Sequence, residues 1–334
     1  MKRIAINGLG RIGRLVLRNF IEAPPDDIEI VAANDLTPMD DLAYLMRYDS
    51  VHGRSPFEVK FGEGFLDLGG RRITVSHEKD PANLPWKALG IDIVLECTGA
   101  FRKRADAAKH IAAGASRVII SAPSEDVDGT FIIGVNEKTY DPAKHHVISN
   151  ASCTTNSLAP TVKVLNDTFG VEYLFVTTIH AYTSSQSLVD KAARKMRRGR
   201  AAGVSFIPTS TGAADATALV IPELAGRMNA VAVRAPVPDG SLTDIVAVLK
   251  KDVTVESING TFKAAAEGPL EGILAYSEDE LVSADIIGCP HSGVIDSLST
   301  MVIMNRFVKL FVWYDNEYGY SHRMLDLAQY ISRA

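Results

Sequence analysis

The chain has 334 residues, 46% of them hydrophobic and 22% charged, so we expect a globular protein with two domains that share a cleft. A net charge of -5 gives no sign of a nucleic-acid surface, and the apolar runs are too short for a signal peptide or a membrane-spanning helix. Three widely spaced cysteines exclude a full disulfide framework, favour a reducing cytoplasmic location and, without paired cysteines, give no metal site.

The first 150 residues alternate between short apolar strands and helices. A strand over residues 3–7 precedes a helix over 11–22, and a second strand follows at 28–33. Further elements are strands at 91–97, 118–121, 131–135 and 147–149, and a helix at 105–113. Strands that alternate with helices pair in parallel, so this half predicts a doubly wound α/β domain with a parallel sheet.

The pattern changes after residue 152. A helix over 156–169 is followed by longer runs rich in Val, Ile, Phe and Thr, which predict a mixed or antiparallel sheet. These predicted strands cover residues 173–180, 228–234, 242–249 and 300–312, and a final helix covers 321–332. The domain boundary is therefore expected near residues 149–152.

A glycine-rich turn joins the first strand to the first helix. Gly8, Gly10 and Gly13 form G-x-G-x-x-G, which allows a tight turn, close backbone approach to a pyrophosphate and close packing of helix on strand. Asp35 follows the second strand, where a carboxylate would bind an adenosine ribose and repel a 2′-phosphate. The alternatives are a plain glycine turn and a capping Asp. Together the two features predict a dinucleotide site that prefers NAD to NADP.

Cys153 lies among small polar residues just before a predicted helix. A helix N-terminus lowers the pKa of a thiol, so we expect Cys153 to be a reactive nucleophile. The alternative, a buried structural cysteine, fits Cys97 and Cys289 better. His180 ends an apolar strand and could serve Cys153 as a base. A histidine at a strand end is commonly structural, and the other seven histidines are given that interpretation.

Several hydroxyl side chains and arginines are candidates for binding phosphate. The turn at residues 209–212 combines hydroxyls with backbone amides, as anion-binding turns do. The basic run at 191–200 has two simpler interpretations, a solvated loop or a subunit contact. The candidate phosphate binders are Ser152, Thr154, Thr183, Arg198, Ser210, Thr211 and Arg234.

Taken together, these segments resemble phosphorylating glyceraldehyde-3-phosphate dehydrogenases. The resemblance covers essentially the whole chain in family order, and it is most specific in the cysteine segment and the segment at 313–319. The matching segments are 4–13, 48–53, 121–124, 151–156, 209–212 and 313–319.

The resemblance implies a Rossmann-type NAD-binding domain over 1–151 and 316–334, and a catalytic domain over 152–315. Cys153 would be the nucleophile and His180 its base in the oxidation of glyceraldehyde 3-phosphate, through a thioester, to 1,3-bisphosphoglycerate. Ser152 and Thr154 would flank the substrate, Thr183 and Arg234 would bind its phosphate, and Thr211, Gly212 and Arg198 would bind inorganic phosphate. The implied cofactor residues are Gly8, Gly10, Arg11, Ile12, Gly13, Asp35, Lys79, Ser121 and Asn316. A homotetramer is also implied.

Two departures and two alternatives remain open. Lys191 and Ala192 replace a Leu-Pro pair of many bacterial relatives, so use of NADP as well as NAD is a hypothesis. Lys79 stands where an Arg is common. The alternative functions are an erythrose-4-phosphate dehydrogenase of the same fold and a Rossmann-type binding protein without catalysis. The intact segments at 121–124 and 211–212 favour the triose enzyme over the first, and retention of Cys153 and His180 argues against the second.

Overall fold

A computed structural model describes residues 1–334 as two compact units. Unit 1 comprises Met1–Ser152 and Ser321–Ala334, and unit 2 comprises Cys153–Tyr320. The last helix, α9 (Tyr318–Ser332), begins in unit 2 and runs into unit 1, where Gln329 donates a hydrogen bond to Asp27. No helix of the structure combines the length and apolar character that crossing a membrane requires.

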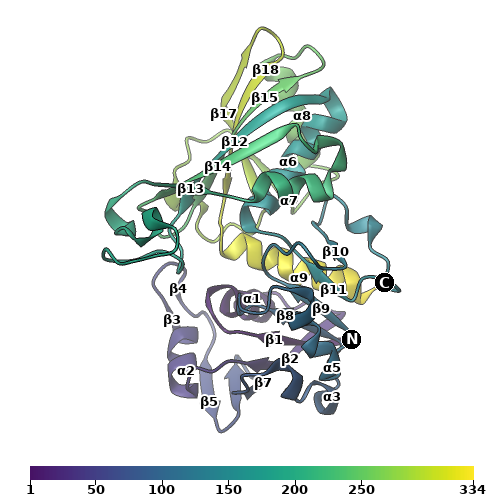
Figure 1. The fold of residues 1–334 in the computed structure, drawn as a ribbon, viewed down its shortest axis with the longest axis vertical. Coiled ribbons are helices and arrows are strands. Elements are labelled where there is room, and N and C mark those ends of the chain that lie inside the picture. Colours follow the sequence, from purple (N-terminus) through teal and green to yellow (C-terminus); the bar gives the residue numbers. More distant parts are fainter. The chain divides into compact units, whose positions relative to one another are not determined.

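Unit 1 is built on a nine-stranded sheet with the order β10-β11-β9-β8-β1-β2-β7-β6-β5 (Figure 1). Its strands are β1 (Lys2–Asn7), β2 (Ile28–Asn34), β5 (Val59–Gly62), β6 (Phe65–Leu68), β7 (Arg71–Ser76), β8 (Ile93–Glu96), β9 (Arg117–Ile120), β10 (Gly129–Thr130) and β11 (Val147–Ser149). A separate ribbon pairs β3 (Tyr48–Asp49) with β4 (Gly53–Arg54). All pairings from β10 to β7 are parallel, and only β5 and β6 are antiparallel additions at one edge. The expected doubly wound, largely parallel sheet is confirmed.

The helices of unit 1 follow its strands. They are α1 (Arg11–Glu22), α2 (Met39–Arg47), α3 (Trp86–Leu89), α4 (Arg104–Ala107) and α5 (Lys109–Ala112). Helix α1 forms because Leu15, Val16 and Phe20 recur at helical spacing and bury one face, as the sequence predicted. Buried strands β1 and β8 are apolar on both faces, as central parallel strands are.

Unit 2 contains a seven-stranded mixed sheet with the order β13-β14-β12-β15-β18-β17-β16. The strands are β12 (Val171–Ala181), β13 (Ile207–Ser210), β14 (Met228–Ala235), β15 (Ser241–Leu249), β16 (Leu274–Ser277), β17 (Gly293–Ile303) and β18 (Phe307–Tyr314). The helices are α6 (Cys153–Phe169), α7 (Ala213–Val220) and α8 (Val255–Ala266); α6 and α8 contact the sheet and each other (Figure 1). The pairs β12–β14 and β16–β17 are parallel and the others antiparallel. This confirms the expected mixed sheet.

Three predicted elements are wrong in detail. Residues 131–135 form no strand, and the sheet ends instead in the short β10. The single strand predicted at 300–312 is a hairpin of β17 and β18, because Met304 and Asn305 adopt positive φ values of 52° and 58° and reverse the chain. The helix predicted at 105–113 is divided into α4 and α5.

Candidate active site

Cys153 is the first residue of α6, which begins three residues earlier than the helix predicted over 156–169. The chain reaches it from β11 through Ala151, which has a φ of 55° and is fully buried. A left-handed backbone is costly for a residue with a Cβ and persists only where its surroundings enforce it. The turn after β11 therefore fixes where the Cys153 side chain begins.

His180 lies next to Cys153. In β12, successive side chains alternate between the two faces of the sheet, so His180 shares the buried face with Val176 and Thr178. The distance from its Nε2 to Cys153 Sγ is 3.4 Å, within hydrogen-bond range for sulfur. The structure thus brings together the thiol and the imidazole that the sequence singled out.

Arg234 lies on the other side of the imidazole. It stands directly opposite His180 in the parallel pairing of β12 and β14. Its Nη1 lies 2.6 Å from His180 Nδ1 and donates to the Ala181 carbonyl oxygen at 2.9 Å, and that oxygen lies 2.7 Å from His180 Nδ1. Burial and the charge of Arg234 lower the pKa of His180 to about 3, so the ring is neutral at pH 7.

The predicted depression of the Cys153 pKa is wrong for this structure. Burial raises the pKa of the thiol to about 11, which outweighs the Arg234 charge and the Thr154 contacts that lower it. Part of the residue still reaches solvent, but the dense protein around the sulfur removes more stabilisation than the helix N-terminus supplies. Burial therefore disfavours the charged form of the thiol as well as that of the imidazole.

Tyr314 is a site residue that sequence reasoning left out. Its hydroxyl lies 2.9 Å from Thr154 Oγ1 and 2.8 Å from Thr178 Oγ1, and its ring packs edge-on against His180. Burial raises the pKa of Tyr314, which stays a neutral phenol. The hydroxyl of Thr154 is thus engaged within the protein. Tyr314 belongs to the specific segment at 313–319, and this was the signal available in the sequence.

The candidate phosphate binders fall into two groups. Thr183 follows β12, and its hydroxyl lies 2.9 Å from that of Ser185, while Ser152 is partly exposed and immediately precedes Cys153. In the second group, Arg198 Nε donates to Thr209 Oγ1 at 3.0 Å and Thr211 Oγ1 accepts from the Ala213 amide. Thr211 and Gly212 stand at the N-terminus of α7, whose amides and dipole favour an anion.

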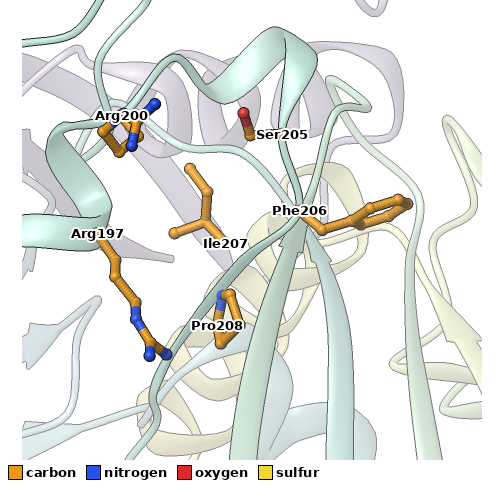
Figure 2. Close-up of a pocket in the computed structure, with 6 residues that line it drawn as sticks. All are labelled: Arg197, Arg200, Ser205, Phe206, Ile207 and Pro208. Carbon is orange, nitrogen blue, oxygen red and sulfur yellow. The ribbon is translucent and has the colours of Figure 1, made fainter.

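A basic pocket of about 250 Å³ adjoins this second group. Its lining includes Arg197 and Arg200, and Figure 2 shows both side chains beside Ile207 and Pro208, with Phe206 pointing away from them. Arg200 is paired with Asp190, which neutralises part of the charge. The 191–200 run is largely exposed, as both simple interpretations of it require.

The glycine-rich turn fits a dinucleotide such as NAD. A Cβ on Gly8 would lie 2.7 Å from the Thr98 amide nitrogen, and a Cβ on Gly13 would lie 2.0 Å from the Gly8 carbonyl oxygen. The protein itself thus requires these two glycines. A Cβ on Gly10 would meet no protein atom within 4 Å and would stand in open space at the N-terminus of α1. Packing within the protein does not require a glycine at position 10, but the absence of a side chain there leaves room for a pyrophosphate.

The remaining cofactor candidates of unit 1 surround this turn. Asp35 accepts hydrogen bonds from the Leu9 and Thr37 amides at 2.6 and 2.9 Å, which fixes its carboxylate beside the turn. The Arg11 side chain forms an ion pair with Asp49, so only its backbone is left for a ligand, as Ile12 offers too. Ser121 directly follows β9, and Lys79 is exposed after β7.

Asn316, the cofactor candidate of unit 2, is held by two residues that sequence reasoning also missed. Ser241 Oγ donates to Asn316 Oδ1 at 2.5 Å, and Asp239 accepts from the Asn316 amide at 3.2 Å. The side-chain oxygen is therefore occupied, and the Nδ2 hydrogens remain to donate. Burial and the neighbouring Asp315 charge raise the pKa of Asp239 to about 9.

The other two cysteines lie outside this geometry. Burial raises the pKa of Cys97 to about 12, as expected for an inert thiol. Cys289 Sγ lies 3.6 Å from His291 Nδ1.

Comparisons with known proteins show which family the chain resembles. Residues 152–316 match the model of the glyceraldehyde 3-phosphate dehydrogenase C-terminal domain, and residues 2–104 match that of its NAD binding domain. The chain is 56% identical to the glyceraldehyde-3-phosphate dehydrogenase of Geobacillus stearothermophilus, over 99% of this chain and 98% of the relative. It is 54% and 48% identical to glyceraldehyde-3-phosphate dehydrogenases 1 and 2 of Bacillus subtilis, over 99% of this chain and 98% and 96% of the relatives.

Proposed function

This chain belongs to the glyceraldehyde-3-phosphate dehydrogenase family, and we propose that Cys153 is its nucleophile and His180 its general base. As a member it is an NAD-dependent oxidoreductase of glycolysis that acts on glyceraldehyde 3-phosphate. The observation that carries the residue assignment is the 3.4 Å contact between Cys153 Sγ and His180 Nε2.

The chemistry follows from the contact between the thiol of Cys153 and the imidazole of His180. Attack of the sulfur on the aldehyde carbon forms a C–S bond and breaks the C=O π bond, and the proton that leaves the thiol ends on the aldehyde oxygen, so the product is a hemithioacetal on Cys153. NAD, when bound, supplies the hydride acceptor. As the C–H bond breaks, His180 Nε2 takes the hydroxyl proton, and the C–O bond becomes the carbonyl of a thioester. Inorganic phosphate then attacks this carbonyl and the C–S bond breaks, so that an acyl phosphate, 1,3-bisphosphoglycerate, leaves and the sulfur regains the proton held by His180.

The two catalytic roles are tested with Cys153→Ser and His180→Asn, with Cys289→Ser as the matched control. Loss of a triad-like nucleophile or base lowers the rate by on the order of a thousandfold or more, whereas the control should retain the parental rate. A Cys153→Ser enzyme with unchanged turnover would refute the assignment of the nucleophile, whereas a parent protein without turnover would favour the non-catalytic binding protein.

The substrate's own phosphate and the inorganic phosphate require two anion sites. We assign Arg234 and Thr183, with Ser152 and Thr154 close to the nucleophile in sequence, to the substrate. Arg198, Thr211 and Gly212 serve inorganic phosphate, because the Arg198 side chain is already hydrogen-bonded to Thr209 of this turn. Arg198→Gln should raise the KM for phosphate more than the KM for the aldehyde.

Erythrose 4-phosphate is the competing substrate. Rates measured for both aldehydes, each with and without inorganic phosphate, decide between them. A triose activity that depends on phosphate is the expected result. A tetrose activity indifferent to phosphate would reverse the choice.

Cofactor preference depends on Asp35 in unit 1 and Lys191 in unit 2. The carboxylate of Asp35 is fixed by two backbone amides, so it cannot turn away from a 2′-phosphate without breaking them, which supports a preference for NAD. Lys191 is exposed and would attract a 2′-phosphate, which supports dual use. We propose NAD as the main cofactor. Comparison of kcat/KM for NAD and NADP, in the parent and in Lys191→Ala, tests both contributions.

An assembly of four copies is also proposed. The face of unit 2 opposite to His180 on β12 exposes Tyr173 by 64% and Phe175 by 69%, and Val231 on the adjacent β14 by 43%. Contiguous apolar side chains on a sheet face are typical of an interface between subunits. Sedimentation equilibrium should give the mass of a tetramer, and Phe175→Glu should lower it.

A further inference from the structure

The last residues of three neighbouring strands in unit 1 are polar and buried. Asn7, Asn34 and Glu96 end β1, β2 and β8, and every other buried residue of these strands is apolar. Asn7 stands opposite both Asn34 and Glu96 in the strand pairing. Apolar residues would fill this space at a lower cost in free energy, so packing alone does not account for three buried polar side chains at one edge of the sheet.

The Glu96 carboxylate joins two turns at this edge. Its Oε2 accepts from Asn7 Nδ2 at 2.6 Å, directly before the glycine-rich turn. Its Oε1 accepts from the Thr98 amide at 2.8 Å and from the Thr98 hydroxyl. Thr98 also packs against the glycine-rich turn, since a Cβ on Gly8 would lie 2.7 Å from its amide nitrogen. Glu96 therefore sets the spacing between the glycine-rich turn and the exposed turn over 98–100.

Two fully buried side chains hold Glu96 from behind. Trp86 Nε1 donates to His110 Nδ1 at 3.0 Å. An indole nitrogen only donates, so Nδ1 accepts and the ring proton is on Nε2, which lies 3.0 Å from Glu96 Oε2. The carboxylate thus accepts four hydrogen bonds, and it cannot rotate without leaving a buried donor unpaired, which is costly.

The same chain of contacts reaches two further turns of the proposed cofactor site. Asn34 Nδ2 donates to Asn7 Oδ1 at 2.8 Å, and Asn34 Oδ1 accepts from the Glu78 amide at 2.8 Å. Asn34 precedes Asp35, and Glu78 precedes Lys79. The strand order reverses between β1 and β8, and ligands of doubly wound sheets bind outside the carboxyl ends of the strands at such a point. The buried chain therefore lies behind the region that a dinucleotide would occupy.

We propose that Glu96 is a positioning residue for the cofactor, which holds the turns after β1 and β8 at the separation that NAD requires. Glu96 is 1% exposed and acts through Asn7 and Thr98 rather than by contact with NAD. This inference rests on the proposed cofactor site at the glycine-rich turn. It goes beyond that site because it assigns the geometry of the turns to one buried carboxylate and its support by His110 and Trp86.

A reciprocal exchange of two side chains tests this role. Glu96→Gln turns one acceptor into a donor that faces other donors, and Asn7→Asp sets two carboxylates against each other. In the double variant Asn7→Asp/Glu96→Gln, the amide and the carboxylate change places. The amide at position 96 then donates to the carboxylate at position 7, which still accepts from Asn34. The hydrogen bond between the two strand ends is restored with its direction reversed.

Two further variants separate positioning from folding. Thr98→Val removes the hydroxyl contact with Glu96 at an exposed position, where folding is not at risk. Asp128→Asn is the matched control. The Asp128 carboxylate also accepts two backbone amides in unit 1, from His146 and Val147, but it does so at the start of β11, at the opposite edge of the parallel sheet.

The Kd for NAD is measured by calorimetric titration, with thermal unfolding and the KM for glyceraldehyde 3-phosphate at saturating NAD recorded alongside. Glu96→Gln and Thr98→Val should each raise the Kd for NAD by about tenfold and leave the KM for the aldehyde unchanged. The double variant should recover most of the affinity that Glu96→Gln loses. Asp128→Asn should bind NAD as the parent does, even if it unfolds earlier.

Parental NAD affinity in Glu96→Gln or in Thr98→Val overturns the inference, and so does a double variant that binds no more tightly than Glu96→Gln. If Glu96→Gln does not fold, Thr98→Val decides. Gly10→Ala acts on the glycine-rich turn without altering any contact of Glu96. Weak NAD binding by Gly10→Ala together with parental binding by Thr98→Val would therefore refute the role of Glu96 and leave the proposed cofactor site intact.

Discussion

Replacement of Gly10 by Ala should separate cofactor binding from folding. Gly10 has a φ of -68°, which alanine adopts without strain, and its Cβ would meet no protein atom within 4 Å. Alanine restricts the unfolded chain and so stabilises the protein by about 0.4–1 kcal/mol, but it is a poorer N-cap than glycine by a similar amount. The two effects offset each other, and the apo protein should keep its stability to within about 1 kcal/mol.

Gly10→Ala should weaken the binding of NAD instead. In the proposed cofactor site, the added methyl group would stand where a bound pyrophosphate approaches the first amides of α1, so at least one charge-assisted hydrogen bond should be lengthened or lost. Such a bond contributes about 2 kcal/mol, which corresponds to roughly a thirtyfold rise in the Kd for NAD. Gly13→Ala provides the contrast. Its Cβ would lie 2.0 Å from the Gly8 carbonyl oxygen, and overpacking of this kind costs about 3 kcal/mol or more of stability even without cofactor.

The assay combines thermal unfolding of the apo protein with calorimetric titration of NAD. Gly260→Ala in α8 is the matched control, since its Cβ also meets nothing within 4 Å and it belongs to unit 2. It should leave NAD affinity unchanged and raise stability by about 1 kcal/mol, the helix propensity difference. The reasoning is refuted if Gly10→Ala binds NAD as tightly as the parent, or if it unfolds as early as Gly13→Ala.

Three further predictions concern the catalytic unit. Because the pKa of Asp239 is raised to about 9, the folded state holds a proton that the unfolded state releases above pH 4; stability should therefore fall with rising pH, by up to about 1.4 kcal/mol per unit. Urea unfolding from pH 5 to 8 should show this slope, and Asp239→Asn should flatten it; an unchanged slope would place the proton elsewhere. Tyr314→Phe leaves two buried threonine hydroxyls with one partner fewer and should cost about 1–3 kcal/mol in chemical denaturation, whereas no loss would mean that they find other partners. Ser241→Ala frees the Asn316 side chain and should raise the KM for NAD about tenfold, about 1.4 kcal/mol, with kcat less affected; equal KM values would show that Ser241 does not orient it.

Features of the fold that depend on a few neighbouring residues could be predicted from the sequence. The turn from β1 into α1 and the placement of Cys153 near a helix start are set by glycines, helical spacing and short polar residues, all readable along the chain. The hairpin of β17 and β18 could not be read this way. Met304 and Asn305 reverse the chain with left-handed backbones, and a methionine gives no turn signal that a glycine would give.

The pKa values of site residues and the contacts between distant residues could not be predicted from the sequence for a different reason. The position of Cys153 at a helix N-terminus predicts a lower thiol pKa, but its actual direction depends on how much protein surrounds the sulfur, which only the packed fold determines. Likewise, the contacts of Tyr314 with Thr154 and Thr178 span 160 and 136 residues, so no spacing rule links them. The contact between Arg234 and His180 depends on which strands become neighbours.

The strand directions in the mixed sheet of unit 2 determine which residues meet at the end of β12. His180 and Arg234 stand opposite each other only because β12 and β14 run in parallel, so that the loops after both strands leave from the same end. On the other side of β12, β15 runs antiparallel and begins with Ser241 at that same end, where its hydroxyl accepts from the Ala181 amide and donates to Asn316. Two parallel strand ends and one antiparallel strand start thus gather the proposed base, the proposed phosphate-binding arginine and the residue that orients Asn316 around the end of β12. In an all-antiparallel sheet, Arg234 would leave its strand at the opposite end from the loop that carries Thr183, and one substrate phosphate could not contact both residues.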